Sequence, residues 1–263
     1  MTLQVKRALV TGAGKRLGRA MALDLAERGF DVAVHYAGSE EAAQDVAGMI
    51  RAKGLRAEAL QADLLEEDAA QALVPRAAEA LGGPLSVLVN NASIFDYDNI
   101  ETTTRESWDR HFESNLRAPF VLTQALAAQV AEPLSDDMDE PVAQGVVVNM
   151  IDQRVRKLTP EFMSYTLAKS ALWTLTRTAA MALAPKVRVN AIGPGPTLQG
   201  ARQSDDHFAR QRAATVLERG ANPADITAAL GYILTSPGFT GQLLCVDGGQ
   251  HLSWQTPDVL GIE

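Results

Sequence analysis

The stretch Gly145–Lys169, GVVVNMIDQRVRKLTPEFMSYTLAK, joins a strand to a helix through a polar loop. Its apolar, β-branched beginning predicts a buried strand. Thr159 is a good N-cap residue and proline is tolerated in the first helical turn, so we predict that a helix begins at Pro160. Tyr165 and Lys169 are four residues apart on this helix and therefore share a face.

A lysine beside a phenol favours the phenolate by its charge. We therefore expect Lys169 to lower the pKa of Tyr165 from its usual value of about 10, which would make Tyr165 a proton donor or acceptor near neutral pH. The spacing alone is a weak indication, because Tyr-x-x-x-Lys occurs by chance on many helices. Whether Tyr165 and Lys169 form a catalytic pair therefore has to be judged from the surrounding sequence.

Strands and helices alternate along the rest of the chain. Further strands are expected at 5–10, 30–36, 55–63, 85–92, 186–194 and 241–249, and helices at 39–53, 66–81, 105–130 and 223–234, besides the one that ends at Gly29. Such alternation predicts βαβ units with right-handed crossovers and a parallel sheet. We therefore predict one doubly wound, Rossmann-like α/β domain over residues 1–263, with three α/β/α layers.

Two segments interrupt this pattern. Residues 132–143 carry two prolines and several acids, and we interpret them as a solvated surface loop. Residues 194–221 are polar and loosely patterned. A connection of this length just beyond a strand predicts a lid over a substrate.

Composition excludes several classes of function. The chain has 263 residues, 46% of them hydrophobic and 21% charged, and a net charge of −8 argues against a nucleic-acid or anionic-membrane partner. No apolar run approaches the ~18 residues that span a membrane, and no signal peptide is recognised, so we expect a cytoplasmic protein. The single cysteine, Cys245, excludes an internal disulfide and is interpreted as a small buried hydrophobe. The histidines are too widely spread to predict a metal site.

A glycine-rich turn, Gly12-Ala13-Gly14-Lys15-Arg16-Leu17-Gly18, lies between the first strand and the first helix. Glycines let the backbone approach a pyrophosphate, which then sits at the positive end of the helix. The turn is not Gly-x-Gly-x-x-Gly, because Leu17 occupies the position of the third glycine. It matches Thr-Gly-x-x-x-x-x-Gly, from Thr11 to Gly18.

Together with Asn90-Asn91-Ala92, Asn115, the Tyr165/Lys169 pair and Pro194-Gly195, this turn resembles the short-chain dehydrogenase/reductase family in order and spacing, from Val5 to about Gly249. The departures are informative. Arg16 replaces the usual middle glycine, Asp152 replaces the catalytic serine, and Asn-Asn-Ala is followed by Ser93 and Phe95. This combination looks like the pteridine reductase branch, which includes bacterial dihydromonapterin reductases.

The resemblance implies roles for individual residues. Phe95 would stack on a pterin against the nicotinamide, Asp152 and Tyr165 would handle protons, Lys169 would hold the nicotinamide ribose, and Asn115 would hold a helix distortion and a relay water. The alternatives are a loop aspartate tied to backbone amides for Asp152, a packing residue for Phe95 and a surface helix residue for Asn115. The implied catalytic residues are Asp152, Tyr165, Lys169 and Asn115, and the implied substrate contacts are Arg16, Ser93, Phe95, Asp152 and Tyr165.

The chemistry of Asp152 also favours a pterin over a ketone as the substrate. A serine hydroxyl suits a ketone because it donates a hydrogen bond to the developing oxyanion, which an ionised aspartate would repel. An aspartate instead pairs with an amino-bearing heterocycle such as a 2-amino-4-oxopteridine. Reduction of its C=N bond needs a hydride on carbon and a proton on nitrogen, which Asp152 and Tyr165 would relay.

The second strand bears on the choice of cofactor. It ends in Val34-His35-Tyr36 without the acid that an NAD-preferring site uses, and Lys15 and Arg16 add positive charge suited to a 2′-phosphate. We therefore expect NADPH, with further hydrogen bonds from His35 and Ser39. The expected cofactor contacts are Gly12, Lys15, Arg16, Leu17, Gly18, His35, Tyr36, Ser39, Asp63, Leu64, Asn91, Ala92, Ser93, Lys169, Pro194 and Gly195. For Asp63 the alternative is a helix N-cap.

Three functions remain open. The first is NADPH-dependent reduction of a dihydropterin such as dihydromonapterin or dihydrofolate. The second is a general carbonyl or 3-oxoacyl thioester reductase, and the third is a catalytically silent dinucleotide-binding protein. The resemblance also implies a homotetramer that packs helices 105–130 and 160–184 across subunits, and a tail, 251–263, that covers a neighbour's site.

Overall fold

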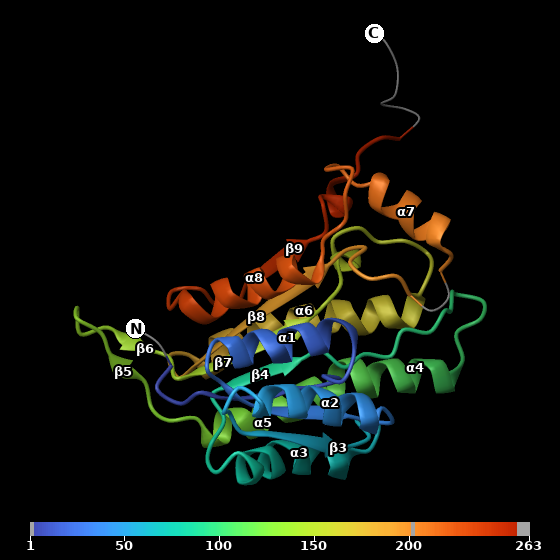
Figure 1. The fold of residues 1–263 in the computed structure, drawn as a ribbon. Coiled ribbons are helices and arrows are strands. Elements are labelled where there is room, and N and C mark those ends of the chain that lie inside the picture. The colour runs from blue at the N-terminus through green and yellow to red at the C-terminus, as the bar shows by residue number, and fades with distance from the viewer. Residues whose placement is uncertain (1–2, 201–202, 257–263) are drawn as a thin grey trace.

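A seven-stranded parallel sheet forms the central layer of the protein (Figure 1). The computed structural model describes residues 3–200 and 203–256. The strand order is β3-β2-β1-β4-β7-β8-β9. The strands are β1 (Arg7–Val10), β2 (Asp31–Tyr36), β3 (Ala57–Gln61), β4 (Val87–Asn90), β7 (Gly145–Met150), β8 (Val187–Pro194) and β9 (Leu243–Val246). The predicted doubly wound, Rossmann-like α/β fold is confirmed.

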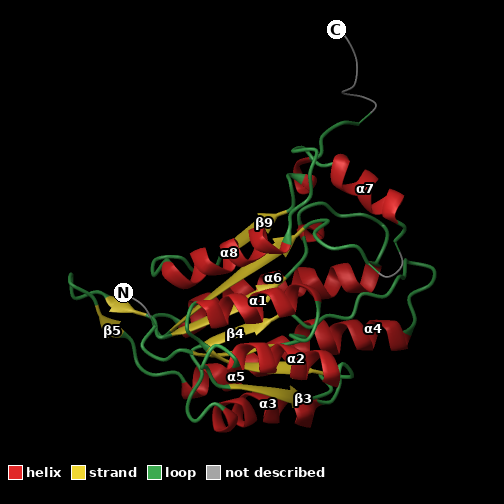
Figure 2. Cartoon of the chain, viewed as in Figure 1, coloured by secondary structure: helices red, strands yellow, loops and turns green. Residues whose placement is uncertain are grey.

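Helices cover both faces of this sheet (Figure 2). Side chains alternate along a strand, so Ala8 and Val10 pack with one helix layer and Leu9 with the other. The first layer contains α1 (Arg16–Glu27), α2 (Glu40–Arg51) and α8 (Pro223–Thr235). The second contains α3 (Glu67–Ala80), α5 (Ala118–Gln129) and α6 (Met163–Leu183).

The strand order places the functional loops together. The chain moves outward from β1 to β3 and then returns to β4 on the other side of β1. The carboxyl ends of β1 and β4 therefore flank the switch point at which doubly wound sheets bind nucleotides. The loops after β7 and β8 follow along the same edge.

The helix predicted over 105–130 is interrupted. It consists of α4 (Arg105–Phe112), a π-helical segment η1 (Glu113–Arg117) and α5. π-Helical segments of this kind are uncommon and are frequent at functional sites.

Both irregular segments contain structure that the sequence did not indicate. Residues 132–143 are not a plain loop but include the short antiparallel strands β5 (Leu134–Ser135) and β6 (Pro141–Val142). Segment 194–221 includes α7 (Asp205–Ala213), whose N-terminus is capped by Ser204. In Figure 1, α7 lies beyond the carboxyl ends of the strands.

The predicted start of α6 is wrong. The helix begins at Met163, and the Thr159 hydroxyl accepts a hydrogen bond from Arg154 instead of capping it. The cap comes from a distant residue, Asp98. Its carbonyl accepts from the Met163 amide at 3.2 Å, and its Oδ1 accepts from the Ser164 amide at 3.1 Å. Sequence reasoning looks for caps next to the helix, and this one lies 66 residues away.

Within the described residues, no helix is long and apolar enough to cross a membrane. The same part of the chain holds no group of three or more His, Cys, Asp or Glu side chains placed to bind a metal ion.

Candidate active site

The glycine turn is held tightly against β4. Gly12 has a φ of +63°, and a Cβ on Gly18 would lie 2.2 Å from the Gly12 carbonyl oxygen, so neither position accepts a larger residue without strain. The Asn91 side-chain amide donates to the Thr11 carbonyl at 2.8 Å, and the Thr11 hydroxyl accepts from the Asn91 and Ala92 amides. The side chain of Asn91 thus shapes the turn.

The N-terminus of α1 is open to an anion. Its N-cap residue, Lys15, is exposed and makes no side-chain capping bond, and the first turn contains no acid. Unpaired amides and the positive helix end are the features that bind a pyrophosphate. Leu17 instead packs against the hydrophobic core, so its side chain faces away from this position.

His35 is not available to a cofactor, contrary to expectation. It is buried, its Nδ1 accepts from the Gly12 amide at 3.0 Å, and its Nε2 donates to the Ala62 carbonyl at 3.1 Å. The amide can only donate, which fixes the tautomer. Burial lowers the pKa of His35 to about 4. The residue supports the glycine turn from below.

The remaining adenosine-side residues lie around the ends of β2 and β3. Ser39 occupies the N-cap position of α2 without using its side chain there, and the Tyr36 phenol is paired with Glu40. Asp63 accepts from the Leu65 amide at 3.0 Å, whereas the N-cap position of α3 is Glu66, so the alternative role of Asp63 as an N-cap is wrong. Leu64 is buried in the core, which leaves only its backbone to face a cofactor.

Arg16 points toward the segment after β8. Its guanidinium donates to the carbonyls of Gln199 at 2.6 Å and Leu198 at 3.0 Å. The expected grouping of Arg16 with His35 and Ser39 around a 2′-phosphate is therefore not present, and Lys15 is the cation left beside the turn.

Asp152, Tyr165 and Lys169 meet at the carboxyl end of β7. The Tyr165 hydroxyl donates to Asp152 Oδ2 at 3.1 Å, and Asp152 Oδ1 accepts from the Arg154 amide at 2.8 Å. Lys169 is buried and its Nζ donates to the Met150 carbonyl at 2.8 Å. Tyr165 and Asp152 are thus joined by a hydrogen bond, and Lys169 interacts with Asp152 through its charge.

The electrostatics of this group differ from the prediction. Burial raises the pKa of Tyr165 well above its usual value, and the Asp152 charge raises it further. Burial also raises the pKa of Asp152 and lowers the pKa of Lys169 to about 8. The expectation that the pKa of Tyr165 is lowered is therefore wrong, because desolvation and the Asp152 charge both raise it.

Phe95 belongs to an aromatic wall. Its ring stacks on Phe162 with centroids 4.3 Å apart and meets the edge of Tyr165 at 4.6 Å. Tyr97 meets Phe162 edge-on at 5.2 Å, and the Arg154 guanidinium lies 5.0 Å from the Phe162 centroid. The sequence reasoning missed Phe162, Tyr97 and Arg154. A possible signal was the position of Phe162 only three residues before Tyr165.

Asn115 lies in the π-helical segment and is fully buried. Its amide donates to the Ile94 carbonyl at 2.8 Å, and its carbonyl oxygen accepts from the Ile94 amide at 2.9 Å. This paired contact excludes the alternative that Asn115 is a surface residue. It fixes the loop that carries Ser93 and Phe95, and the Ser93 side chain reaches the Tyr165 phenol.

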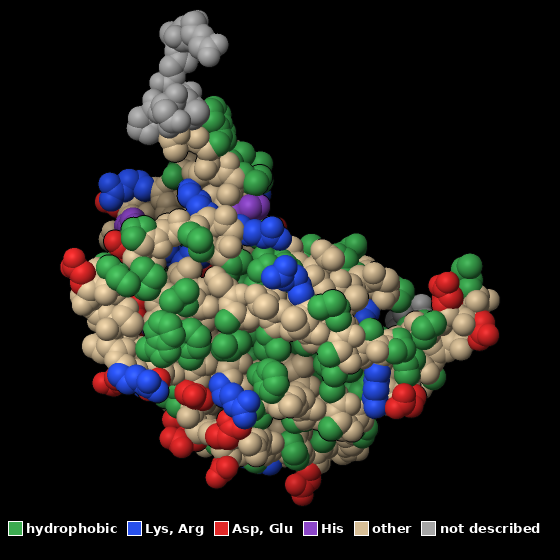
Figure 3. All heavy atoms as spheres, turned by 180° about the vertical axis from the view of Figure 1, so that it is seen from behind, with side chains coloured by type: hydrophobic (Ala, Val, Ile, Leu, Met, Phe, Trp, Pro, Cys, Tyr) green, Lys and Arg blue, Asp and Glu red, His purple; other side chains and the backbone are tan. Residues whose placement is uncertain are grey.

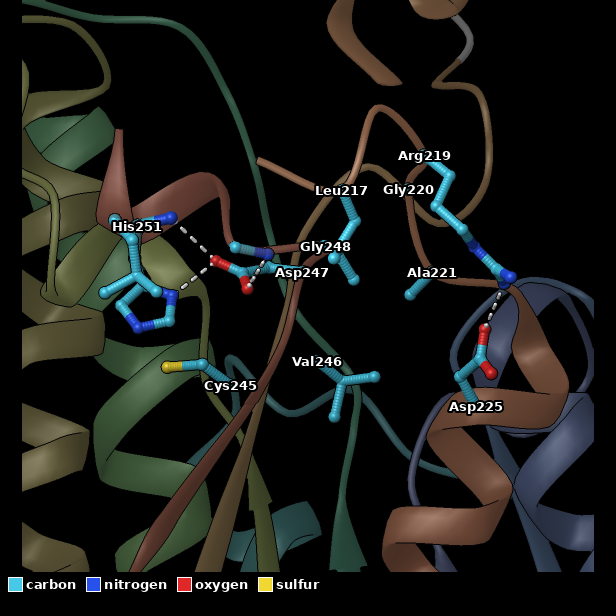
Figure 4. A pocket seen from close by; sticks show the side chains of 12 residues that line it. Leu217, Arg219, Gly220, Ala221, Asp225, Cys245, Val246, Asp247, Gly248 and His251 are labelled. Carbon is cyan, nitrogen blue, oxygen red and sulfur yellow. Dashed lines mark hydrogen bonds and ion pairs between the residues drawn. The ribbon is translucent and has the colours of Figure 1, made fainter. Parts of the chain in front are cut away.

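A cavity of about 520 Å³ lies beside β9 and the second half of segment 194–221 (Figure 4). On one side the Asp247 carboxylate binds the His251 ring and amide, and on the other Arg219 pairs with Asp225. Gly195 borders Asp247 so closely that a Cβ would lie 2.5 Å from the Asp247 Cβ. Pro194 and Gly195 therefore fix the path of the chain as it leaves β8.

The fold and this geometry define a Rossmann-like dinucleotide-binding protein in which buried Tyr165 and Lys169 lie with half-buried Asp152 beside the switch point. A family profile described as enoyl-(acyl carrier protein) reductase matches residues 12–251. The chain is 31% identical to the 3-oxoacyl-(acyl-carrier-protein) reductase FabG of Staphylococcus aureus, over 94% of this chain and 98% of that protein. This protein belongs to the short-chain dehydrogenase/reductase family.

Two solved structures give a closer view of the family. FolM alternative dihydrofolate reductase 1 from Brucella suis, in complex with NADP, is 42% identical with a TM-score of 0.90, and the match covers 98% of this chain and 100% of that chain. A short-chain dehydrogenase from Burkholderia cenocepacia, also with NADP, is 33% identical with a TM-score of 0.84 over 95% and 99% of the two chains.

Proposed function

We propose that this protein is an NADPH-dependent reductase that transfers a hydride to the C=N bond of a dihydropterin such as dihydromonapterin or dihydrofolate. The single observation that carries the proposal is the hydrogen bond between Tyr165 and Asp152, at the position where a carbonyl reductase of this family would place a serine.

The cofactor is NADP(H). The uncapped N-terminus of α1, the close approach at Gly18 and the exposed Lys15 suit a phosphorylated dinucleotide. The structural relatives from Brucella and Burkholderia were crystallised with NADP. NADPH supplies the hydride.

The residues of this chain account for the proton. Tyr165 has a raised pKa and is therefore a protonated phenol at neutral pH, poised to donate to the pterin nitrogen as the ring carbon receives the hydride. Asp152 accepts from that phenol and lies where it can take a hydrogen bond from an amino group of the substrate. Lys169, buried beneath Tyr165, adds positive charge that favours loss of the phenol proton.

The aromatic wall supports a flat substrate. Phe95 is 42% exposed and stacks on Phe162 and Tyr165, so the aromatic wall extends from Tyr165 to the surface, where a flat heterocycle could pack against it. The Brucella relative, whose description is a dihydrofolate reductase, supports the same class of substrate.

The second candidate is reduction of a 3-oxoacyl thioester. The identity to FabG favours it. Asp152 disfavours it, because a carboxylate beside Tyr165 would repel the oxyanion that forms during ketone reduction.

NADPH oxidation at 340 nm with dihydromonapterin, dihydrofolate and an acetoacetyl thioester separates the two candidates. We expect turnover on a pterin and little on the thioester. Turnover on the thioester alone would replace the proposal with the second candidate.

Asp152→Ser tests the role of the carboxylate: pterin turnover should fall roughly 100-fold if Asp152 takes part in proton transfer. Unchanged pterin turnover in this variant would remove Asp152 from the mechanism.

We also propose that the protein is a homotetramer. Figure 3, which shows the opposite side of the molecule from Figure 1, displays hydrophobic side chains gathered between charged ones. Exposed large hydrophobic residues occur on α4, α5 and α6: Trp108, Phe120, Leu167 and Met181. Light scattering on the purified protein gives the mass directly, and a monomer would refute the tetramer. Of the tail proposed to cover a neighbour's site, 251–263, residues 257–263 lie outside the described part of the chain.

A further inference from the structure

Three side chains form a buried hydrogen-bonded network behind Tyr165. Asp98 comes from the loop between β4 and α4, His111 from the last turn of α4, and Ser164 from the first turn of α6. The Ser164 hydroxyl bonds Asp98 Oδ2, and His111 Nδ1 lies 2.6 Å from the Ser164 hydroxyl oxygen. All three residues are buried, with exposed fractions of 1%, 0% and 0%.

The direction of each hydrogen bond is fixed by its surroundings. The Asp96 amide donates to His111 Nε2 at 3.1 Å, so Nε2 carries no proton and Nδ1 does. His111 therefore donates to Ser164, and Ser164 donates to Asp98. Burial lowers the pKa of His111, which keeps the ring neutral as this arrangement requires. Burial opposes ionisation of Asp98, but hydrogen bonds from Ser164 and Ser107 outweigh it and lower the pKa of Asp98.

The network connects the two parts of the proposed active site. Ser164 directly precedes Tyr165, and the His111 ring meets the Tyr165 ring at an angle of 71° with centroids 6.0 Å apart. Asp98 caps α6 and lies on the same loop as Phe95. The position of the phenol relative to the aromatic wall therefore depends on three buried hydrogen bonds of Ser164. Its hydroxyl and its amide both donate to Asp98, and its hydroxyl oxygen accepts from His111.

This network is more than a helix cap requires. A serine or threonine next to the helix would serve as a cap without burying a carboxylate and an imidazole, both of which are costly to desolvate. Polar networks that are buried and fully paired fix a single arrangement of the elements they join. Here the elements joined are those that carry Tyr165 and Phe95.

We propose that Asp98, Ser164 and His111 form a positioning network that holds the Tyr165 phenol in register with Asp152 and with the aromatic wall. The inference rests on the proposed role of Tyr165 as the proton donor. Since no member of the network contacts the reacting atoms, its members are positioning residues.

Ser164→Ala tests the network without removing bulk. We expect kcat to fall roughly 10- to 100-fold, the effect of a misplaced catalytic group, while the dissociation constant of NADPH changes less than about threefold. With NADPH deuterated at the transferred hydrogen, the isotope effect on kcat should rise, because hydride transfer becomes more rate-limiting. The matched control is Thr123→Val, which removes a buried hydroxyl from α5 that bonds only the Pro119 carbonyl. It should leave kcat and the isotope effect unchanged.

Two substitutions at His111 separate hydrogen bonding from packing. His111→Asn places an amide donor near the position of Nδ1 and should retain most of the activity, whereas His111→Leu fills the space without a donor and should match Ser164→Ala. Equal activity of the asparagine and leucine variants would contradict the donor role. A kcat for Ser164→Ala within twofold of the parent enzyme would overturn the network.

The kinetic measurements use whichever of the pterin and thioester substrates the parent enzyme reduces. Turnover on the thioester alone would refute the proposed function and leave the network fully testable. A crystal structure of Ser164→Ala decides the question independently of turnover. A Tyr165 hydroxyl displaced from the 3.1 Å contact with Asp152 supports the network, and an unchanged contact overturns it.

Discussion

At the scale of single residues, the site is governed by desolvation. Lys169 lies near Tyr165, but its ammonium is 5.8 Å from the ring centroid and donates to the Met150 carbonyl. Asp152 contacts the hydroxyl directly and opposes its ionisation. The phenol is therefore protonated at neutral pH. This suits an acid that gives its proton only when hydride transfer creates a basic nitrogen.

Tyr165→Phe removes that proton and keeps the ring. We expect kcat to fall roughly 10²- to 10⁴-fold, the usual contribution of a general acid, because the variant loses the hydroxyl that donates to Asp152. NADPH binding should change less than about threefold, since the ring still packs against Phe95. Steady-state kinetics and fluorescence titration of NADPH measure the two effects. Retention of parental kcat would exclude Tyr165 as the donor.

Some of these residues could be predicted from the sequence. Tyr165 and Lys169 were found from their spacing on one helix, and Asp152 was found from the resemblance to the family, in which it replaces the catalytic serine. The directions of their pKa shifts could not be predicted, since they depend on burial by residues that are distant in sequence. Phe162 and His111 were missed for the same reason: the contact of Phe162 with Phe95 and that of His111 with Tyr165 exist only in the folded chain.

At the scale of elements, the start of α6 shows where local signals fail. Thr159 and Pro160 form a plausible helix start, but Phe162 adopts a left-handed φ of +56° and the helix begins after it. A left-handed aromatic residue is uncommon and is maintained only by its surroundings. Here Asp98, which caps the helix, and Arg154, which makes a cation–π contact with the Phe162 ring, hold the residue in this conformation.

Arg16 connects two elements, and its replacement tests that connection. Arg16→Ala removes two hydrogen bonds to the carbonyls of Leu198 and Gln199. We expect the KM of the substrate to rise roughly 5- to 30-fold, which corresponds to about 1–2 kcal/mol for charged hydrogen bonds in a partly exposed setting. The preference for NADPH over NADH should persist, because the guanidinium is engaged elsewhere.

Lys15→Ala is the matched control for Arg16→Ala. It removes a neighbouring charge, that of the N-cap residue of α1, and it should weaken NADPH binding more than NADH binding. Initial rates with both cofactors distinguish the two variants. If Arg16→Ala lost the preference for NADPH while the substrate KM stayed unchanged, the result would show that Arg16 binds the 2′-phosphate.

The thiol of Cys245 tests the environment of β9. Burial raises its pKa to about 11, and Asp247 adds to the shift. At pH 7.5 the thiolate population should be roughly 300-fold lower than for an ordinary cysteine, and greater intrinsic nucleophilicity offsets part of this, so alkylation should be roughly 30-fold slower. Iodoacetamide labelling followed by mass spectrometry measures the rate at a single site, because the chain has one cysteine. Urea-unfolded protein serves as the control and should react at the ordinary rate. Cys245 is half-buried rather than fully buried as the sequence suggested, and equal rates in the folded and unfolded states would contradict even this partial burial.

At the scale of the whole molecule, the alternation of strands and helices was sufficient to predict a parallel, doubly wound sheet. The strand order, and with it the switch point between β1 and β4, came from the structure and not from the sequence. The hairpin of β5 and β6 and the helix α7 were not predicted. Their stability comes from local turns, such as the amides of Met138 and Glu140 that donate to Asp136, and their hydrophobic patterns are short.

The stability of the whole fold should depend on the protonation of His35, which joins β2 to the glycine turn and to Ala62. Its pKa is lowered from 6.5 to about 4, so the unfolded chain binds the proton more tightly. The contribution of neutral His35 is therefore complete above pH 6.5 and is lost as the pH falls toward 4, by about 3 kcal/mol for a shift of this size. Urea unfolding between pH 8 and pH 4.5 should show this decline.

His35→Asn isolates the effect of His35 from that of other groups. Its side-chain oxygen can accept from the Gly12 amide, as His35 Nδ1 does, but it does not titrate. His111 also has a lowered pKa and loses stability in the same direction, whereas Asp152 has a raised pKa and gains stability as the pH falls. These contributions are shared by both proteins and cancel in the difference between their curves. That difference in the free energy of unfolding should shrink as the pH drops below 6.5. Only the parent has a His35 that is protonated in the unfolded chain but stays neutral in the folded one. Parallel curves across this range would mean that His35 is as readily protonated in the fold as in the unfolded chain, and its role beneath the glycine turn would have to be abandoned.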